Sequence, residues 1–434
     1  MTGSTQAPVT GNDSIQAFTL DQCIDYALQH QPAAQQALIN INIAKTSNAI
    51  SMAGWYPQVN LTGGVSHYLQ LPTTFVNSAA TGGTIPQKTG IVNTAIPAVS
   101  VTQTIFNPSL IYAVKSAPLY IKQAEQINDS TKIDIVANVS KSFYNLLLTL
   151  QQIDVLKEDT TRLGKTLHDA YHQYIAGIVD ETDYEQATIT LNNSLAQLRQ
   201  ANENVRPQYS ILKQAIGYDP EKQFNVVFDT LQMMKQVVFD TTLPLQYTKR
   251  IEYQALQTTK GLQKQLTNYY QRAYIPTVSA FYNYDYEFQN ADFSKLFNQA
   301  YPYSNIGIQF TMPIFTGFAR VKNVQKAKLI ESLSDWTEIN LKAQIYSEYT
   351  SALANYKSTY YNMNMLKDNR ALAKRVYRVV MLQYGQGVVP YLNVITAESN
   401  LITAEIGYIN SLYQLLSGKI DLEKSMGLLT TANH

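Results

Sequence analysis

Few residues in this 434-residue chain have types and spacings that could do chemistry. His168 and His172 are four residues apart, so their rings would share one face of a helix and could bind a metal ion. The surrounding sequence lacks the glutamate of an HExxH site, and Cys23 is the single cysteine. No GxSxG, Walker A or GxGxxG sequence occurs. We therefore expect no enzyme, no cofactor and no metal centre, with both histidines at the surface.

A second candidate is the acidic cluster that follows Gly177, formed by Asp180, Glu181, Asp183 and Glu185. Carboxylates crowded in a narrow wet passage attract cations and resist anions. Acidic residues also favour the first turn of a helix, where they interact with its dipole. Both interpretations stay open at this stage.

The element that must position this cluster is a long helix before it. Between Val136 and Tyr174 apolar residues recur with a mean spacing of about 3.5, the period of a coiled coil. We expect a helix that begins at Pro108 and runs unbroken from Leu119 to about Tyr174, a turn near Gly177, and a returning helix that ends at Gly217. Asp183 is expected two turns into the returning helix.

The same pattern returns 210 residues later, which predicts an internal duplication. Matched residues include Tyr174 and Tyr384, Gly177 and Gly387, Val179 and Val389, Ala187 and Ala397, and Asp183 and Asn393. The predicted repeats are residues 18–217 and 245–427, with a connector at 218–244, a flexible polar arm at 1–17 and a tail at 428–434. The arm lacks the apolar core of a signal peptide.

Each repeat also contains two stretches in which apolar and polar residues alternate, as in β-strands. These predicted strands cover about 58–71, 97–106, 277–288 and 304–315, with a long loop at 72–96. In the third strand an aromatic face alternates with Asn283, Asp285 and Glu287. We expect the aromatic residues Tyr282, Tyr284, Tyr286 and Phe288 to face lipid.

Four strands are too few to close a barrel, so other subunits must close the sheet edges. Two subunits would give eight strands and a packed interior, whereas three would give twelve strands and room for water, which the polar face favours. The net charge is +1 with 15% charged residues, so no basic surface exists for nucleic acid.

The order of several motifs supports a family resemblance. These are FTLDQCIDYAL near the start, WYPQV before the first strand, TQTIF and TMPIF before the long helices, and the two tips YIAGIVDETDYEQATITL and YGQGVVPYLNVITAESNL. Over residues 18–427 the chain resembles the TolC-type outer-membrane efflux proteins. The resemblance implies a homotrimer whose twelve-stranded transmembrane β-barrel in the outer membrane continues into an α-barrel of coiled-coil helices that crosses the periplasm. It also implies an exit channel that docks with a periplasmic adaptor and an inner-membrane pump.

Site residues can be placed on this pattern. The resemblance implies a pore constriction at Asp183, with Asp180 and Glu181 nearby, but the second repeat has Asn393 at the matched position. The glycines that turn the two hairpins mark the expected tips where an adaptor docks. This predicted docking surface comprises Tyr174, Gly177, Ile178, Tyr384, Gly387 and Val388.

Other functions remain open from the sequence. A soluble coiled-coil scaffold would explain the helices but not the strands at equivalent places in both repeats. Within transport, a passive porin or a type I protein-secretion duct would have the same pattern.

Overall fold

The computed structural model describes residues 16–77, 82–228 and 237–429. Its contacts define two compact units, each built from segments that are distant in sequence. The helical unit contains the described residues up to Ile41, Ala124–Leu256 and those from Thr337 onward, and the sheet unit contains Asn42–Gln123 and Gln257–Trp336. Each unit therefore takes residues from both predicted repeats.

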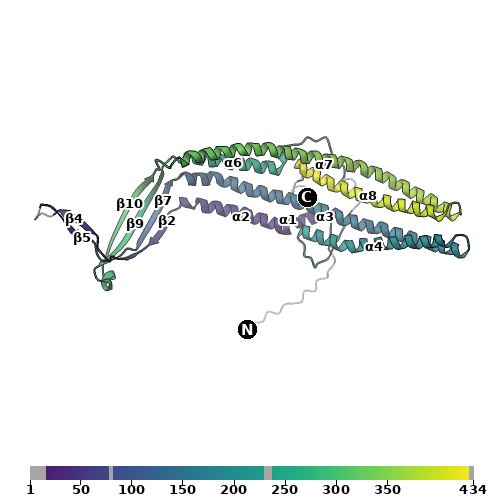
Figure 1. Cartoon of the computed structure of the whole chain (residues 1–434), viewed down its shortest axis with the longest axis horizontal. Helices are drawn as coiled ribbons and strands as arrows, with labels where there is room; N and C mark the ends of the chain where they lie inside the picture. The colour runs from purple at the N-terminus through teal and green to yellow at the C-terminus, as the bar shows by residue number, and fades with distance from the viewer. Residues whose placement is uncertain (1–15, 78–81, 229–236, 430–434) are drawn as a thin grey trace, which may run out of the picture. The chain divides into compact units, whose positions relative to one another are not determined.

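The helical unit consists mainly of two antiparallel helical hairpins (Figure 1). Helix α3, Pro108–Ile175, is followed by α4, Glu181–Ile216, and helix α7, Ala319–Gly385, is followed by α8, Tyr391–Met426. The residues of α3 before Ala124 and those of α7 before Thr337 belong to the sheet unit. Both bounds of α8 lie 210 residues beyond those of α4. Helix α3 contains Pro118 and α4 contains Pro207 without interruption.

The core of the helical unit lies where the hairpins meet α1, Leu20–His30. Thr19 and Gln22 form a capping box at the start of α1, which buries one apolar face. The fully buried members include Cys23, Ile24 and Ala27 of α1, Val139 and Leu146 of α3, Leu212 and Ile216 of α4, and Leu415 and Leu422 of α8. Burial of these side chains fixes the hairpins to α1 and supplies most of the unit's stability.

Glycines end α4 and α8 in the left-handed conformation and allow close packing there. Gly217 has φ 70°, and a Cβ on it would lie 2.8 Å from Cα of Gln31. Gly427 has φ 68°, and its Cβ would lie 2.7 Å from the carbonyl carbon of Lys249. Any other residue would meet both backbone strain and a clash.

The sheet unit contains four strand paths in an antiparallel sheet. Its strands are β2, Gln58–Thr62, β3, Val65–His67, β6, Asn93–Ala95, β7, Ala98–Phe106, β9, Thr277–Asn290, and β10, Ala300–Thr311. β7 lies between β2 and β9, β10 pairs with the other side of β9, and β6 continues the β7 path along β9. Breaks at Gly63–Gly64 and Ile96–Pro97 divide the first two paths, because glycine and proline weaken a ladder.

The predicted loop at 72–96 was wrong in part. It contains β4, Thr73–Asn77, which pairs with β5, Thr84–Lys88, and it also contains β6. The Thr, Phe and Val content of TTFVN favours a strand, but the surrounding glycines and prolines obscured the pattern. The fourth predicted strand was displaced, since β10 ends at Thr311 before Pro313, which has no N–H to donate.

The remaining elements connect these parts. They are α2, Pro32–Met52, η1, Ala53–Trp55, η2, Tyr247–Lys249, α6, Ile251–Arg272, and η3, Phe293–Asn298. The predicted connector was not wholly irregular, because β8, Phe224–Val226, pairs in parallel with β1, Gln16–Phe18. Phe18 and Phe224 pack edge to face with ring centroids 5.3 Å apart, which holds these short strands together. Most of the predicted arm, residues 1–15, and of the tail, 430–434, lies outside the described residues.

Candidate functional site

The two hairpin tips have the same backbone structure. Gly177 and Gly387 both have φ 69°. The Ile178 N–H donates to Gln173 O at 2.9 Å, and the Val388 N–H donates to Gln383 O at 2.9 Å. These are the six-to-one bonds of a Schellman motif, which satisfies the last carbonyls of a helix. Ile178 and Val388 are exposed at corresponding places on the two tips.

The tyrosines at the tips differ in burial. Tyr384 is 6% exposed and packs against Tyr391, which is 1% exposed, with ring centroids 5.5 Å apart. These two rings form a small core with Ala170 of α3 and Ala187 of α4. Tyr174 is only partly buried and stacks on Tyr184 of its own hairpin. Tyr384 is therefore placed to join the tips of the two hairpins, and Tyr174 to close one of them.

The acidic residues begin α4 on the first tip. Asp180 precedes the helix in extended conformation, and the Asp183 N–H donates to Asp180 O at 3.2 Å. Asp183 therefore lies in the first helical turn, so the prediction that it lies two turns in was wrong. Burial and the nearby Asp180 carboxylate raise the pKa of Asp183 above its ordinary value. Glu181 and Asn393 are exposed.

Asp183 also acts on the tyrosines of the second tip. Its charge, together with burial as the larger cause, raises the pKa values of Tyr384 and Tyr391. The structure thus brings Asp183 close to the core that joins the tips, which sequence spacing alone did not indicate.

One face of the four-path sheet is mostly apolar, with Gln103 and Ser304 as polar exceptions. The strand register places these side chains on it: Val59, Leu61, Val99, Val101, Val278, Ala280, Tyr282, Tyr284, Tyr286, Phe288, Ile306, Ile308 and Phe310. Ile306, Ile308 and Phe310 on β10 are strongly exposed in the chain. The rings of Tyr286 and Phe288 are neighbours, with centroids 5.2 Å apart. An exposed apolar surface of this extent requires lipid or protein to cover it.

The opposite face of the sheet is polar. It carries Asn60, Ser100, Thr102, Asn283, Asp285, Glu287, Asn305 and Gln309. Three aromatic residues also lie on this face. They are Tyr301 and Tyr303 of β10, and Phe281, whose ring lies over Gly307 on the neighbouring strand, where a Cβ would meet it at 2.7 Å. Such a split between faces suits a sheet with lipid on one side and water on the other.

The structure shows neither a metal site nor a membrane-crossing helix in the described ranges. No group of three or more metal-binding side chains occurs among residues 16–77, 82–228 and 237–429. His168 and His172 lie ring edge to face, 4.4 Å between centroids, at an exposed place on α3. No helix in the described part of the chain is both long and apolar enough to span a membrane.

Comparison with known families decides the assignment. Residues 23–218 match the family described as outer membrane efflux protein. This match confirms the resemblance to the outer membrane efflux proteins. This family consists of outer-membrane channels for efflux rather than enzymes, which confirms the prediction of a non-enzymatic transport protein.

Solved structures show the same fold over nearly the whole length of this efflux protein. It is similar to the outer membrane protein VceC of Vibrio cholerae, with 16% identity, a TM-score of 0.74, and coverage of 94% of this chain and 96% of that one. For CusC the identity is 16%, the TM-score 0.77 and the coverage 98% of both chains. For the Campylobacter jejuni CmeC outer membrane channel the identity is 18%, the TM-score is 0.73, and the coverage is 95% of this chain and 86% of that one. No curated protein sequence matches the chain.

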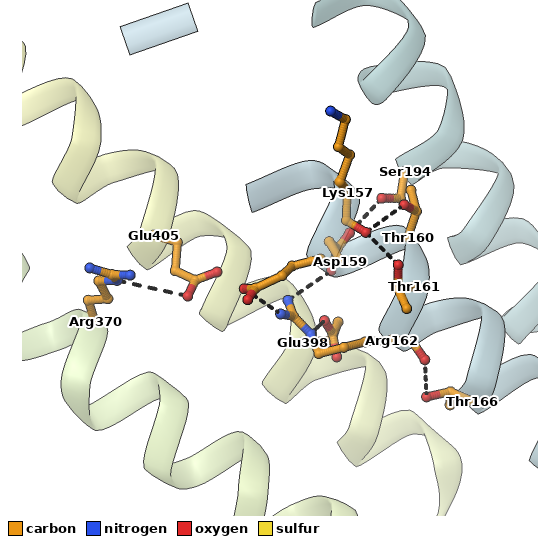
Figure 2. Close-up of polar contacts among 11 residues, drawn as sticks. Lys157, Asp159, Thr160, Thr161, Arg162, Thr166, Ser194, Arg370, Glu398 and Glu405 are labelled. Atoms are coloured by element: carbon orange, nitrogen blue, oxygen red, sulfur yellow. Dashed lines mark hydrogen bonds and ion pairs between the residues drawn. The ribbon is translucent and has the colours of Figure 1, made fainter. Parts of the chain in front are cut away.

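Sequence reasoning missed a charged cluster inside the helical unit of this efflux protein (Figure 2). Arg162 of α3 donates from Nε to Oε1 of Glu398 on α8 at 3.1 Å, and from a terminal nitrogen to Asp159 at 3.2 Å. Asp159 accepts a hydrogen bond of 2.5 Å from Oγ of Ser194 on α4. The Arg162 guanidinium also lies over the ring of Tyr377 on α7, 5.7 Å from its centroid. All four long helices thus meet at Arg162.

A second pair lies one heptad further along α8. Nε of Arg370 is 3.8 Å from Oε1 of Glu405, and its guanidinium lies over the ring of Tyr408. A signal for this pair existed in the sequence, since Glu405 interrupts the apolar spacing of Val394, Ala397, Leu401, Tyr408 and Leu412. A charge at such a core position indicates a buried partner.

Proposed function

We propose that this protein is a homotrimeric channel that forms the exit duct of an efflux system exporting small molecules across the periplasm and the outer membrane. The family match supports the proposal, because the resemblance implies trimeric ducts that dock with a periplasmic adaptor and an inner-membrane pump. The matching bounds of α4 and α8 support the two repeats, 18–217 and 245–427, with the connector between them.

The main support for a trimer is that, in the described part of the chain, both edge strands of the sheet lack a pairing partner on their outer side. Within the described residues β2 pairs only with β7, and the twelve-residue β10 pairs only with β9. Long unpaired edges beside an exposed apolar face promote aggregation unless other chains pair with them. Three copies would join four strand paths each into twelve strands, with the polar face inside and space for water.

The aromatic face would then contact the outer-membrane lipid. β9 has fourteen residues and β10 twelve, enough for tilted strands to cross the apolar layer, which takes about 9–11 residues. Tyr282, Tyr284, Tyr286 and Phe288 would lie in this lipid-facing surface.

The hairpin tips would form the periplasmic end. Ile178 and Val388 are exposed beside the turning glycines Gly177 and Gly387, so they are suited to adaptor docking. Tyr174 and Tyr384 lie one turn earlier, at the ends of the preceding helices. In a trimer, Asp183 would contribute a ring of three carboxylates to a constriction, with Asp180 and Glu181 nearby and Asn393 from the second tip. Such a ring favours cations.

Crosslinking between sheet edges tests the trimer. Asn60→Cys on β2 and Asn305→Cys on β10 place one thiol on each edge path, while the native Cys23 is buried and unreactive. A flexible bis-maleimide should yield a covalent three-chain species from the double variant. Each single variant is the matched control and should not yield that species, and a double variant that stays monomeric under these conditions would contradict the proposal.

A further inference from the structure

The charged cluster around Arg162 contains more buried negative than positive charge. The side chains of Asp159, Glu398 and Glu405 are 0%, 2% and 3% exposed. The two cations, Arg162 and Arg370, are more exposed, at 24% and 43%. If every group were ionised, three buried carboxylates would face two partly hydrated cations, and burial of an uncompensated charge is costly.

The hydrogen bonding of the cluster is also incomplete. Oε2 of Glu398 and Oε2 of Glu405 are buried and have no hydrogen-bond partner among the described residues. A buried carboxylate oxygen without a donor is unfavourable, whereas a protonated Glu398 carries no charge and can donate a hydrogen bond to the neighbouring Asp159 carboxylate. The cluster is therefore built to hold a proton.

We propose that Glu398 takes up a proton and that this proton strengthens the packing of α8 against α3, so that the two helical hairpins are joined by a proton-sensitive connection. This connection lies within one chain. It would make the packing of the helical unit in the proposed channel depend on pH. Only the periplasmic setting of this pH dependence rests on the proposed function.

Glu398 is the best placed of the three carboxylates. Burial raises its pKa to about 7, the Asp159 carboxyl adds to the effect, and the Arg162 charge and the Tyr377 hydroxyl oppose it. The charged and titratable groups around the cluster are Glu158, Asp159, Arg162, Lys165 and Asp169 on α3, Arg370, Lys374, Tyr377 and Arg378 on α7, and Tyr391, Glu405 and Tyr408 on α8. From α4, the neutral Ser194 hydroxyl donates a hydrogen bond to Asp159.

The direction of the response follows from linkage. The pKa of Glu398 in the folded chain lies above that of an unfolded carboxyl, so the folded packing binds this proton more tightly. The stabilisation is present at low pH and is lost as pH rises through about 7. Acid should therefore tighten the contact between α8 and α3, and alkali should weaken it.

Difference infrared spectroscopy on the purified full chain in detergent tests for the proton directly. We expect a protonated-carboxyl band that decreases between about pH 6 and about pH 8 in the natural chain and is absent from Glu398→Gln. Glu203→Gln, on the exposed face of α4, is the matched control and should keep the band. A natural chain without the band at about pH 6, or a band that persists in Glu398→Gln, would overturn the proposal.

A second variant keeps the test decisive if Glu398→Gln folds poorly. Asp159→Asn removes the neighbouring carboxyl that helps to raise the Glu398 pKa, so the band should titrate at lower pH. An unchanged titration in Asp159→Asn would contradict the assignment to Glu398. None of these measurements needs transport or a trimer, so failure here would leave the duct function untouched.

Discussion

The two hairpin tips share one backbone and use it differently. Helix α4 begins with Glu181 after Asp180, and helix α8 begins at the matched position with Tyr391 after Pro390. The first tip therefore presents charge to water, whereas the second buries an aromatic pair between the hairpins. The glycine turn determines where the chain reverses. The residues after it determine whether the tip exposes carboxylates or buries aromatic rings between the hairpins.

The largest expected effect of this difference is on stability. Tyr391→Ala removes a side chain that is 1% exposed, and we expect a loss of about 3–5 kcal/mol in the free energy of unfolding. Glu181→Ala at the matched exposed position should change it by about 0.5 kcal/mol or less. Denaturant unfolding of both variants in detergent measures the difference, and equal losses would break the comparison.

The turning glycines should behave alike. Gly177→Ala and Gly387→Ala each force a side chain into φ 69° but meet no atom within 4 Å, so each should cost about 1 kcal/mol. Gly217→Ala adds a clash with Gln31 and should cost clearly more. The same unfolding assay checks this order, and a large difference between the two tip glycines would show that their surroundings are not equivalent.

The charge at the two tips should affect the cation preference of the channel. Asp183→Asn should reduce the cation preference of single channels in a planar bilayer, and Asn393→Asp should increase it, because in the proposed trimer each variant changes the charge at the constriction by three. Both effects should weaken in high salt. Reversal potentials measure the cation preference. An unchanged value in Asp183→Asn would contradict a role in ion selectivity and would favour a role only in the first turn of α4.

The smallest expected effect is the pH dependence of that preference. Burial and Asp180 raise the pKa of Asp183, so its charge is lost at a higher pH than that of an ordinary aspartate as the solution is acidified. Cation preference should fall on acidification, and Asp180→Asn should move that fall to lower pH. Reversal potentials across a pH series give both values, and a fall that Asp180→Asn does not move would contradict the interaction.

The sequence was enough to predict the hairpins but not their packing. Gly177 and Gly387 punctuate an apolar period near 3.5, so α4 and α8 began and ended close to the predicted positions. Burial of Tyr384 but not of Tyr174 depends on contact between the hairpins, and periodicity along one helix contains no information about it.

The strands and the charged cluster show two further limits. Period-two alternation located β7 and β9, but the short strands β4 and β5 have too few residues for a clear period. Apolar spacing alone does not predict that Glu398 and Glu405 are buried. Their burial depends on pairing with Arg162 and Arg370, which lie on other helices.

The mass of the purified particle in detergent, with the detergent contribution subtracted, tests the central claim most directly. A trimeric channel predicts a protein mass of three 48.8 kDa chains and a bound detergent belt around the apolar face of the sheet. A particle of one chain that stays soluble after the detergent is removed would contradict the account.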